Sequence, residues 1–165
     1  MPNRSTHLLV GATTGGVFAA HCARNRSPFS QLVQAAGGTC GGALGSALPD
    51  LFDPALTPWH RETSHSLAMG TTIVYSRSML KACEEFCQRR AEYNRLMRTT
   101  LVREKHGEFF VPVAENSFSQ LLSVLGELFW EFLAGFLNGI AAGYASHLAL
   151  DALTPHSIPL LARGF

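Results

Sequence analysis

Two side chains that commonly bind metal ions, His147 and Asp151, are four positions apart in the most hydrophobic stretch of the sequence. Residues at this spacing lie on the same face of a helix, so one imidazole nitrogen and one carboxylate oxygen could bind the same ion. The pair alone is a weak signal, because a His and an Asp near a helix end are often structural. Ionisable groups close to hydrocarbon are costly, however, and this setting favours a functional role.

A proline-rich segment, residues 49–66, adds four side chains of the same two kinds: Asp50, Asp53, His60 and His65. Taken by themselves, the two carboxylates beside Pro49 and Pro54 could equally serve to cap a helix and form a turn. Arg61 carries a permanent charge whose geometry suits a phosphate or a carboxylate. His7 belongs to the first turn of the first predicted helix, so it becomes a further candidate ligand.

This mixture of imidazoles and carboxylates suits Zn²⁺, Mn²⁺ or Fe²⁺ better than Ca²⁺, which prefers oxygen ligands alone. The candidates are too many for one tetrahedral ion and fit two ions bridged by a carboxylate, with one or two residues left for acid–base work. Bound water is more acidic at such a centre, which predicts hydrolysis, with phosphoesters as the favoured substrates. The seven candidate metal ligands are His7, Asp50, Asp53, His60, His65, His147 and Asp151.

The hydrophobic pattern predicts the helices that must position these residues. Ser5 and Thr6 are suitable N-caps for a helix reaching about Ala20, and a second segment rich in Gly and Ala covers 30–48. A third helix is predicted from near Ser64 through Met79, continuing into a charged stretch over 81–98. We therefore predict an all-α, membrane-associated bundle of about four helices in a single domain, 1–165, with a charged helical extension and loop over 77–116.

The last predicted helix is long enough to cross a membrane. From Phe132 to Leu150 the sequence has nineteen residues without Lys, Arg, Asp or Glu, which matches the thickness of a bilayer. The small residues of 30–48 would allow close helix packing there. Glu127 and Glu131 are predicted to form a polar face at the membrane interface, with additional metal ligation as the alternative.

The composition excludes several classes of protein. Of 165 residues, 47% are hydrophobic and 15% are charged, against about 25% charged in average soluble domains. A net charge of +1 argues against disorder and against a nucleic-acid partner bound through bulk charge. Four cysteines do not make a disulfide scaffold, and Cys83 and Cys87 are interpreted as part of a helix face rather than a metal pair. Glycines interrupt the apolar run 8–20, which favours a retained helix over a cleaved signal peptide.

The distribution of charge predicts an orientation for an integral membrane protein. If the four segments cross up and down, the turn at Arg24 and Arg26 and the stretch 77–105 share one side, with ten of the thirteen Lys and Arg residues. The positive-inside rule makes that side cytoplasmic. The same arrangement gathers the seven candidate ligands at the opposite, non-cytoplasmic end.

Four motifs occur in order along the chain: Thr6-His7-Leu8-Leu9, the segment 48–54 (LPDLFDP), the segment 60–66 (HRETSHS) and the segment 143–155 (GYASHLALDALTP). Taken together, they resemble the YdjM-like family of LexA-binding, inner membrane-associated, metal-dependent hydrolases. The resemblance implies a metal site at the seven candidate ligands, with Arg61 and Ser66 beside it. The chain departs from the family pattern at Glu62, where glycine is usual, and in the spacing of Asp50 and Asp53.

The principal hypothesis is a hydrolase of the inner membrane that uses a divalent metal, Zn or else Mn or Fe, on an amphiphilic phosphoester. In it, Arg61 neutralises developing charge, and a histidine not needed as a ligand, with His60 as the candidate, protonates the leaving group. The alternative is a non-catalytic membrane tether that recruits a soluble protein through residues 81–98. A third hypothesis is a metal that only holds the bundle together.

Overall fold

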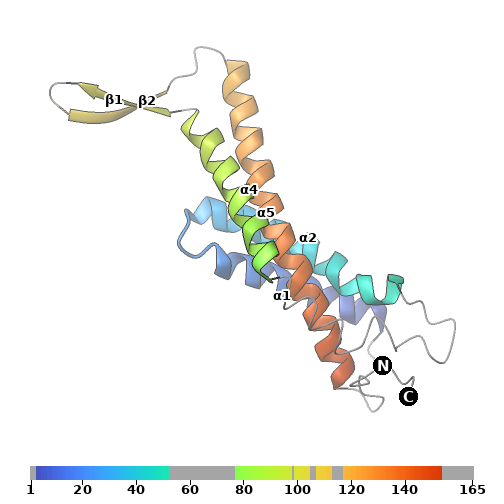
Figure 1. Ribbon diagram of the computed structural model, residues 1–165. Helices are drawn as coiled ribbons and strands as arrows, with labels where there is room; N and C mark the ends of the chain where they lie inside the picture. Colours follow the sequence, from blue (N-terminus) through green and yellow to red (C-terminus); the bar gives the residue numbers. More distant parts are fainter. Residues whose placement is uncertain (1–2, 53–76, 98, 105–106, 113–116, 154–165) are drawn as a thin grey trace.

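The computed structural model describes residues 3–52, 77–97, 99–104, 107–112 and 117–153 (Figure 1). The predicted all-α helical bundle is confirmed, and a short β-hairpin is added to it. In chain order the elements are α1 (Arg4–Cys22), α2 (Pro28–Phe52), α4 (Arg77–Leu96), β1 (Thr99–Glu104), β2 (Gly107–Pro112) and α5 (Ser117–Ala152).

Helix α1 begins earlier than predicted, at Arg4, because Asn3, rather than Ser5 or Thr6, is its N-cap. The Asn3 side chain accepts a hydrogen bond from the backbone N–H of Thr6 at 2.9 Å. The same oxygen accepts from the hydroxyls of Ser5 and Thr6, at 2.7 Å each. One side chain thus satisfies a free N–H of the first turn and fixes the turn that carries His7.

Helix α2 continues through Pro49 to Phe52, which corrects the prediction that a loop begins at Pro49. Proline cannot donate to the carbonyl four residues earlier and usually clashes with it. Here that residue is Gly45, and the helix continues for the last few residues without this hydrogen bond. As a result, Asp50 lies on the last turn of a helix and not in a loop.

Helices α1, α2 and α5 pack with their backbones in contact. A Cβ atom added to Gly42 of α2 would lie 2.9 Å from the Cα of Gly15 in α1. On α5, a Cβ added to Gly139 would lie 2.8 Å from the Cα of Gly38, and one added to Gly143 would lie 2.7 Å from the Cα of Gly42. Small residues that let helices approach this closely are typical of membrane proteins.

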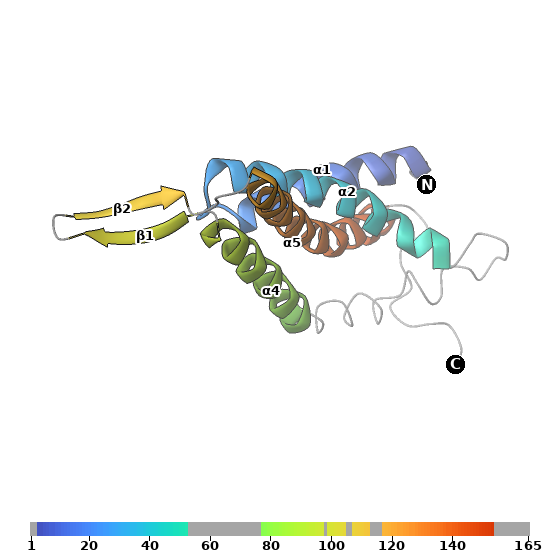
Figure 2. The same cartoon turned by 90° about the horizontal axis from the view of Figure 1, so that it is seen from above.

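Helix α4 lies alongside the first half of α5 and leads into the hairpin at the end of the molecule far from the N-terminus (Figures 1 and 2). Strands β1 and β2 pair antiparallel, from Thr99 opposite Pro112 to Glu104 opposite Gly107. The helical part of the predicted extension is thus present. The predicted loop after it is partly a hairpin, and the predicted helix start near Ser64 lies outside the described residues.

Within the described residues, α5 is the one helix that is long and apolar enough to cross a membrane, over Phe118–Ala152. Its 36 residues extend about 54 Å at 1.5 Å per residue. The helix begins fifteen residues before the predicted start at Phe132. The two acidic residues before that point, Glu127 and Glu131, do not interrupt it, because glutamate is a good helix former; both are buried.

Candidate metal centre

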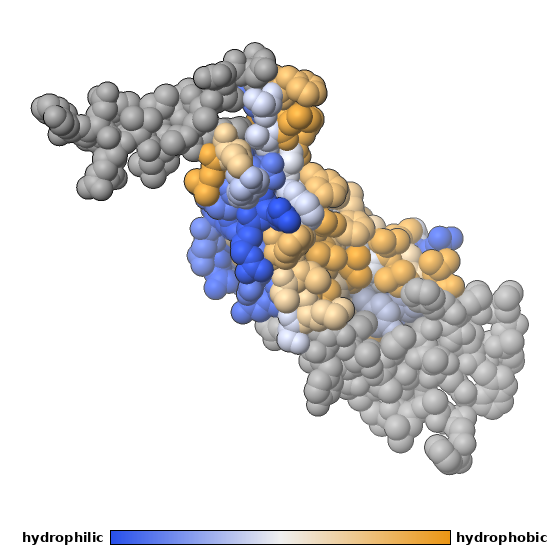
Figure 3. Space-filling view, turned by 45° about the horizontal axis from the view of Figure 1, so that its top comes forward, coloured by the Kyte–Doolittle hydropathy of each residue, from blue (hydrophilic) through white to orange (hydrophobic). Residues whose placement is uncertain are grey.

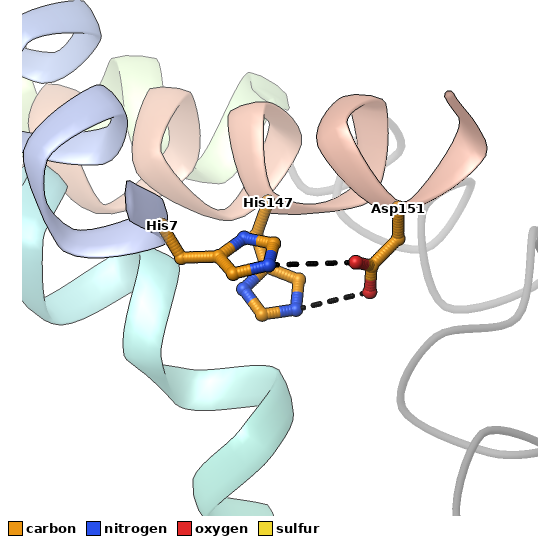
Figure 4. A group of neighbouring side chains, drawn as sticks. All are labelled: His7, His147 and Asp151. Carbon is orange, nitrogen blue, oxygen red and sulfur yellow. Dashed lines mark ion pairs between the residues drawn. The ribbon is translucent and has the colours of Figure 1, made fainter. Parts of the chain in front are cut away.

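His147 and Asp151 lie one above the other on the last two turns of α5, as their spacing predicts (Figure 4). The Nε2 atom of His147 is 3.3 Å from the Oδ2 atom of Asp151. Both side chains are almost completely buried, with 1% and 6% of their surface exposed. An imidazole and a carboxylate are therefore held together away from water at one end of the bundle.

Helix α1 brings His7 to the same place. Its Nε2 atom is 3.5 Å from Oδ1, the other carboxylate oxygen of Asp151. The rings of His7 and His147 stack, with centroids 4.0 Å apart and planes inclined by 25° (Figure 4). One potential ligand atom from each of the three residues lies within 4.8 Å of the others. Among the described residues, these three form the one buried group of potential metal ligands.

Asp50 approaches the group from the last turn of α2. Its Oδ1 atom is 3.7 Å from Nε2 of His147, and its side chain is 49% exposed. This position follows from the continuation of α2 through Pro49. Asp50 therefore forms the solvent-facing edge of the group, whereas Asp151 forms its buried side.

A backbone contact fixes the orientation of the His147 ring. Its Nδ1 atom lies 2.6 Å from the carbonyl oxygen of Ser46, which can only accept a hydrogen bond. Nδ1 must therefore carry the proton, and in the neutral ring Nε2 is left with its lone pair facing the two carboxylates. Histidines that bind metals typically donate their second ring N–H to a carbonyl or a carboxylate in this way.

The separations in the group are compatible with a set of metal ligands as well as with ion pairs between the two imidazoles and the Asp151 carboxylate. Hydrogen bonds between charged groups are usually about 2.7–2.9 Å long, shorter than the 3.3 and 3.5 Å observed here. Two ligands of a tetrahedral ion, each about 2.1 Å from it, lie about 3.4 Å apart. Two imidazoles and a carboxylate are also a donor set that Zn²⁺ commonly accepts. The group can therefore hold a divalent ion.

Comparison with protein families matches residues 1–162, nearly the entire chain, to the YdjM inner membrane protein family. The chain belongs to the YdjM inner membrane protein family. The family resemblance inferred from the four motifs is thereby confirmed, and membrane association is supported by both the family and the apolar helix α5. Comparisons with curated proteins and with solved structures found no match.

Of the seven ligands predicted for this YdjM family member, the structure brings four together, from three helices: His7, Asp50, His147 and Asp151. The others, Asp53, His60 and His65, lie outside the described residues, as do Arg61 and Ser66. The main contribution that sequence reasoning missed is the Ser46 carbonyl. Every residue has a backbone carbonyl, so the sequence does not show which one accepts this hydrogen bond. The packing of α2 against α5 shows it.

Glu127 and Glu131 do not form the predicted polar face at the membrane interface, since both are buried. Glu131 accepts a hydrogen bond from the side-chain amide of Gln34, which is completely buried in α2. Glu131 is sixteen residues before His147, or about 24 Å along the helix. Neither carboxylate therefore belongs to the group formed by His7, His147 and Asp151.

Proposed function

We propose that this YdjM family protein is an integral membrane, metal-dependent hydrolase that cleaves a phosphoester of a lipid or a lipid-linked substrate. The observation that carries the proposal is the buried group of His7, His147 and Asp151, with Nε2 of His147 turned toward two carboxylates by the Ser46 carbonyl. Two imidazoles and a carboxylate gathered in one buried place are a donor set that a divalent cation accepts.

The chain's own residues would divide the work by their exposure. His7, His147 and Asp151 would hold the ion on its buried side, and the half-exposed Asp50 would complete the site at its open edge. A divalent ion in such a site polarises a phosphoryl oxygen and lowers the pKa of water. Arg61 is suited to stabilise the charge that develops on phosphate, because its guanidinium offers two parallel donors.

Large apolar side chains around the group favour an amphiphilic substrate. Leu9 and Leu153 lie two residues after His7 and Asp151, and Leu51 directly follows Asp50. Of the surface of these three leucines, 68–84% is exposed. Exposed leucines on α1, on α2 and just after the end of α5, at one end of an apolar bundle, would contact acyl chains. A substrate whose phosphate enters the group while its hydrocarbon stays on these leucines fits this arrangement.

The test is the metal content of detergent-purified protein, measured by elemental mass spectrometry. We expect about two equivalents of Zn, Mn or Fe in the wild type, and a lower metal content in His147→Ala and Asp151→Ala, because each variant removes a proposed ligand. His21→Ala is the matched control, because His21 is exposed at the other end of α1 and should leave the metal content unchanged.

Absence of metal from the wild type, after purification without chelators and after attempted reconstitution, would overturn the proposal. That result would favour the alternative function, in which the charged face of α4 binds a soluble partner. Unfolding on chelation, with no hydrolysis of phosphoester lipids by the metal-loaded protein, would instead assign the metal a purely structural role.

A further inference from the structure

The first half of α5 exposes a regular row of large apolar side chains. Most of them follow an alternating spacing of four and three residues, which is the heptad spacing of helices that pair in coiled coils. Their exposed fractions are 37–68%. Figure 3 shows apolar side chains gathered along one side of the molecule, next to the hydrophilic surface of α4. The row, called here the α5 stripe, consists of Phe118, Leu121, Leu122, Leu125, Phe129 and Phe132.

The polar side of this part of α5 faces inward. Glu127 and Glu131 are buried, and Glu131 is bonded to Gln34 of α2. On the helix they lie roughly opposite the α5 stripe, at 100° per residue. A helix of a water-soluble monomer would show the reverse arrangement, with its apolar stripe covered. The α5 stripe is therefore a surface that something else should cover.

The bilayer is a poor candidate for that cover. Helix α5 is about 54 Å long and contains no proline, whereas hydrocarbon is about 30 Å thick and takes about 20 residues. If 132–151 cross the bilayer, the first fifteen residues must project beyond it along the same axis. An unbroken helix cannot cross the membrane with one half and lie flat on its surface with the other.

Polar contacts mark where the hydrocarbon should end. Arg26, in the turn between α1 and α2, donates a hydrogen bond to Gln88 of α4 at 3.0 Å and approaches Glu92 at 3.9 Å. This level corresponds to Trp130 on α5, whose ring meets Phe86 of α4 edge to face. Tryptophan is common at the membrane–water interface. Most of the α5 stripe lies on the far side of this level, beside a helix with many charged residues.

We propose that the α5 stripe is the interface between two copies of this chain, which pair through the first halves of their α5 helices. The proposal rests on the membrane-spanning α5 of the proposed function, but not on the metal. Copies inserted in one orientation present parallel helices, so each residue of the α5 stripe meets its own counterpart about a two-fold axis. At about 200 Å² per large side chain, with about half of each exposed, the six residues of the α5 stripe offer about 600 Å² per copy. This is close to the roughly 800 Å² per partner of a standard interface.

The packing farther along α5 supports a helix as the partner. The heptad spacing continues through Phe132 to Phe136, whose backbones lie against Gly37 and Gly41 of α2. The row of large apolar residues thus meets α2 in the second half of α5, whereas in the first half no helix among the described residues covers it. An α5 helix from a second copy would extend the same kind of contact.

Disulfide cross-linking of the full-length protein in its native membrane tests this pairing. The four native cysteines are first replaced by serine. With Leu125→Cys added, mild oxidation should link two copies, at least tenfold more than with Ser119→Cys. Ser119 is exposed on the same helix but lies about 100° away from the α5 stripe. Equal linking at the two positions, or none at Leu125→Cys, would overturn the proposal.

A second measurement separates this proposal from the hydrolase. By light scattering in detergent, the wild type should have the mass of two chains. The triple variant Leu122→Ser/Leu125→Ser/Phe129→Ser should have the mass of one chain and keep the wild-type metal content. A wild-type dimer that holds no metal would overturn only the hydrolase. Cross-linking of a photoreactive lipid at residue 125 would show that lipid covers the α5 stripe and would overturn the dimer.

Discussion

The two halves of α5 are packed in opposite ways. In the second half, glycines such as Gly139 and Gly143 bring the helix backbone against that of α2. In the first half, α5 meets α4 through side chains, including the edge-to-face pair of Phe86 and Trp130. The first contact depends on the absence of side chains, and the second depends on their presence.

The proposed membrane crossing of α5 would account for this contrast. Between apolar helices in a membrane no hydrophobic effect drives association, so close backbone packing must supply the attraction. Where water is present, burial of large apolar side chains contributes about 25 cal/mol per Å². The buried group of His7, His147 and Asp151 lies at the closely packed end, where helices can hold ligands most rigidly.

The largest expected effect comes from adding one methyl group to each half. In Gly139→Ala, the new Cβ would lie 2.8 Å from the Cα of Gly38, so α2 and α5 must separate. In the matched variant Gly126→Ala, the nearest atoms belong to the side chain of Asn94, which can move. We expect Gly139→Ala to destabilise by about 2 kcal/mol or more, as overpacking of a core does. Gly126→Ala should change stability by at most about 1 kcal/mol, in part through better helix propensity.

Thermal loss of helical circular dichroism in detergent measures both variants. Equal midpoints for Gly139→Ala and Gly126→Ala would contradict the contrast between the two halves. A lower midpoint for Gly126→Ala than for Gly139→Ala would reverse it.

The next effect is expected at the junction, where Gln34 of α2 bonds to Glu131 of α5. Gln34→Leu would leave the buried Glu131 carboxyl without this amide, at a cost of about 1–3 kcal/mol. Removing both polar groups in Gln34→Leu/Glu131→Leu should recover most of that loss, because no polar group is then left unsatisfied. Chemical denaturation of all three proteins in the same detergent gives the comparison. A double variant as unstable as the sum of its single variants would show that the pair does not act as a unit.

The sequence predicted the parts of this molecule that depend on residue type and spacing. The spacing of His147 and Asp151 placed them on one face, and the up-and-down order of helices placed His7 at the same end. The gap of nineteen residues without charge identified only the second half of α5. Its first half was missed because Glu127 and Glu131 suggested an interface, and nothing in the sequence shows that Gln34 meets Glu131.

Backbone geometry explains the remaining differences. Proline at position 49 predicted the end of α2, yet the helix continues to Phe52 without the hydrogen bond that proline cannot donate to the Gly45 carbonyl. This continuation decides where Asp50 lies relative to His147. The bond from His147 to the Ser46 carbonyl depends on the same continuation of α2. Residue types therefore predicted which of the described candidate residues gather at this end of the bundle, whereas packing determined how their side chains are oriented.

The smallest expected effect concerns thiol reactivity and reports on the surroundings of each half. Cys40 of α2 and Cys83 of α4 are both exposed on the protein surface, whereas Cys87 is buried. Burial raises the pKa of the Cys87 thiol, and the nearby Cys83 raises it further, so less of the reactive thiolate forms at neutral pH. In membranes, a water-soluble maleimide should label a variant that keeps only Cys83 about tenfold faster than one that keeps only Cys87. A variant that keeps only Cys40 should also react slowly while lipid covers it, and should approach the Cys83 rate only in detergent. Fast labelling of Cys40 in intact membranes would show that water, not lipid, covers the surface of α2. It would contradict the inference that the two halves of α5 lie in different environments.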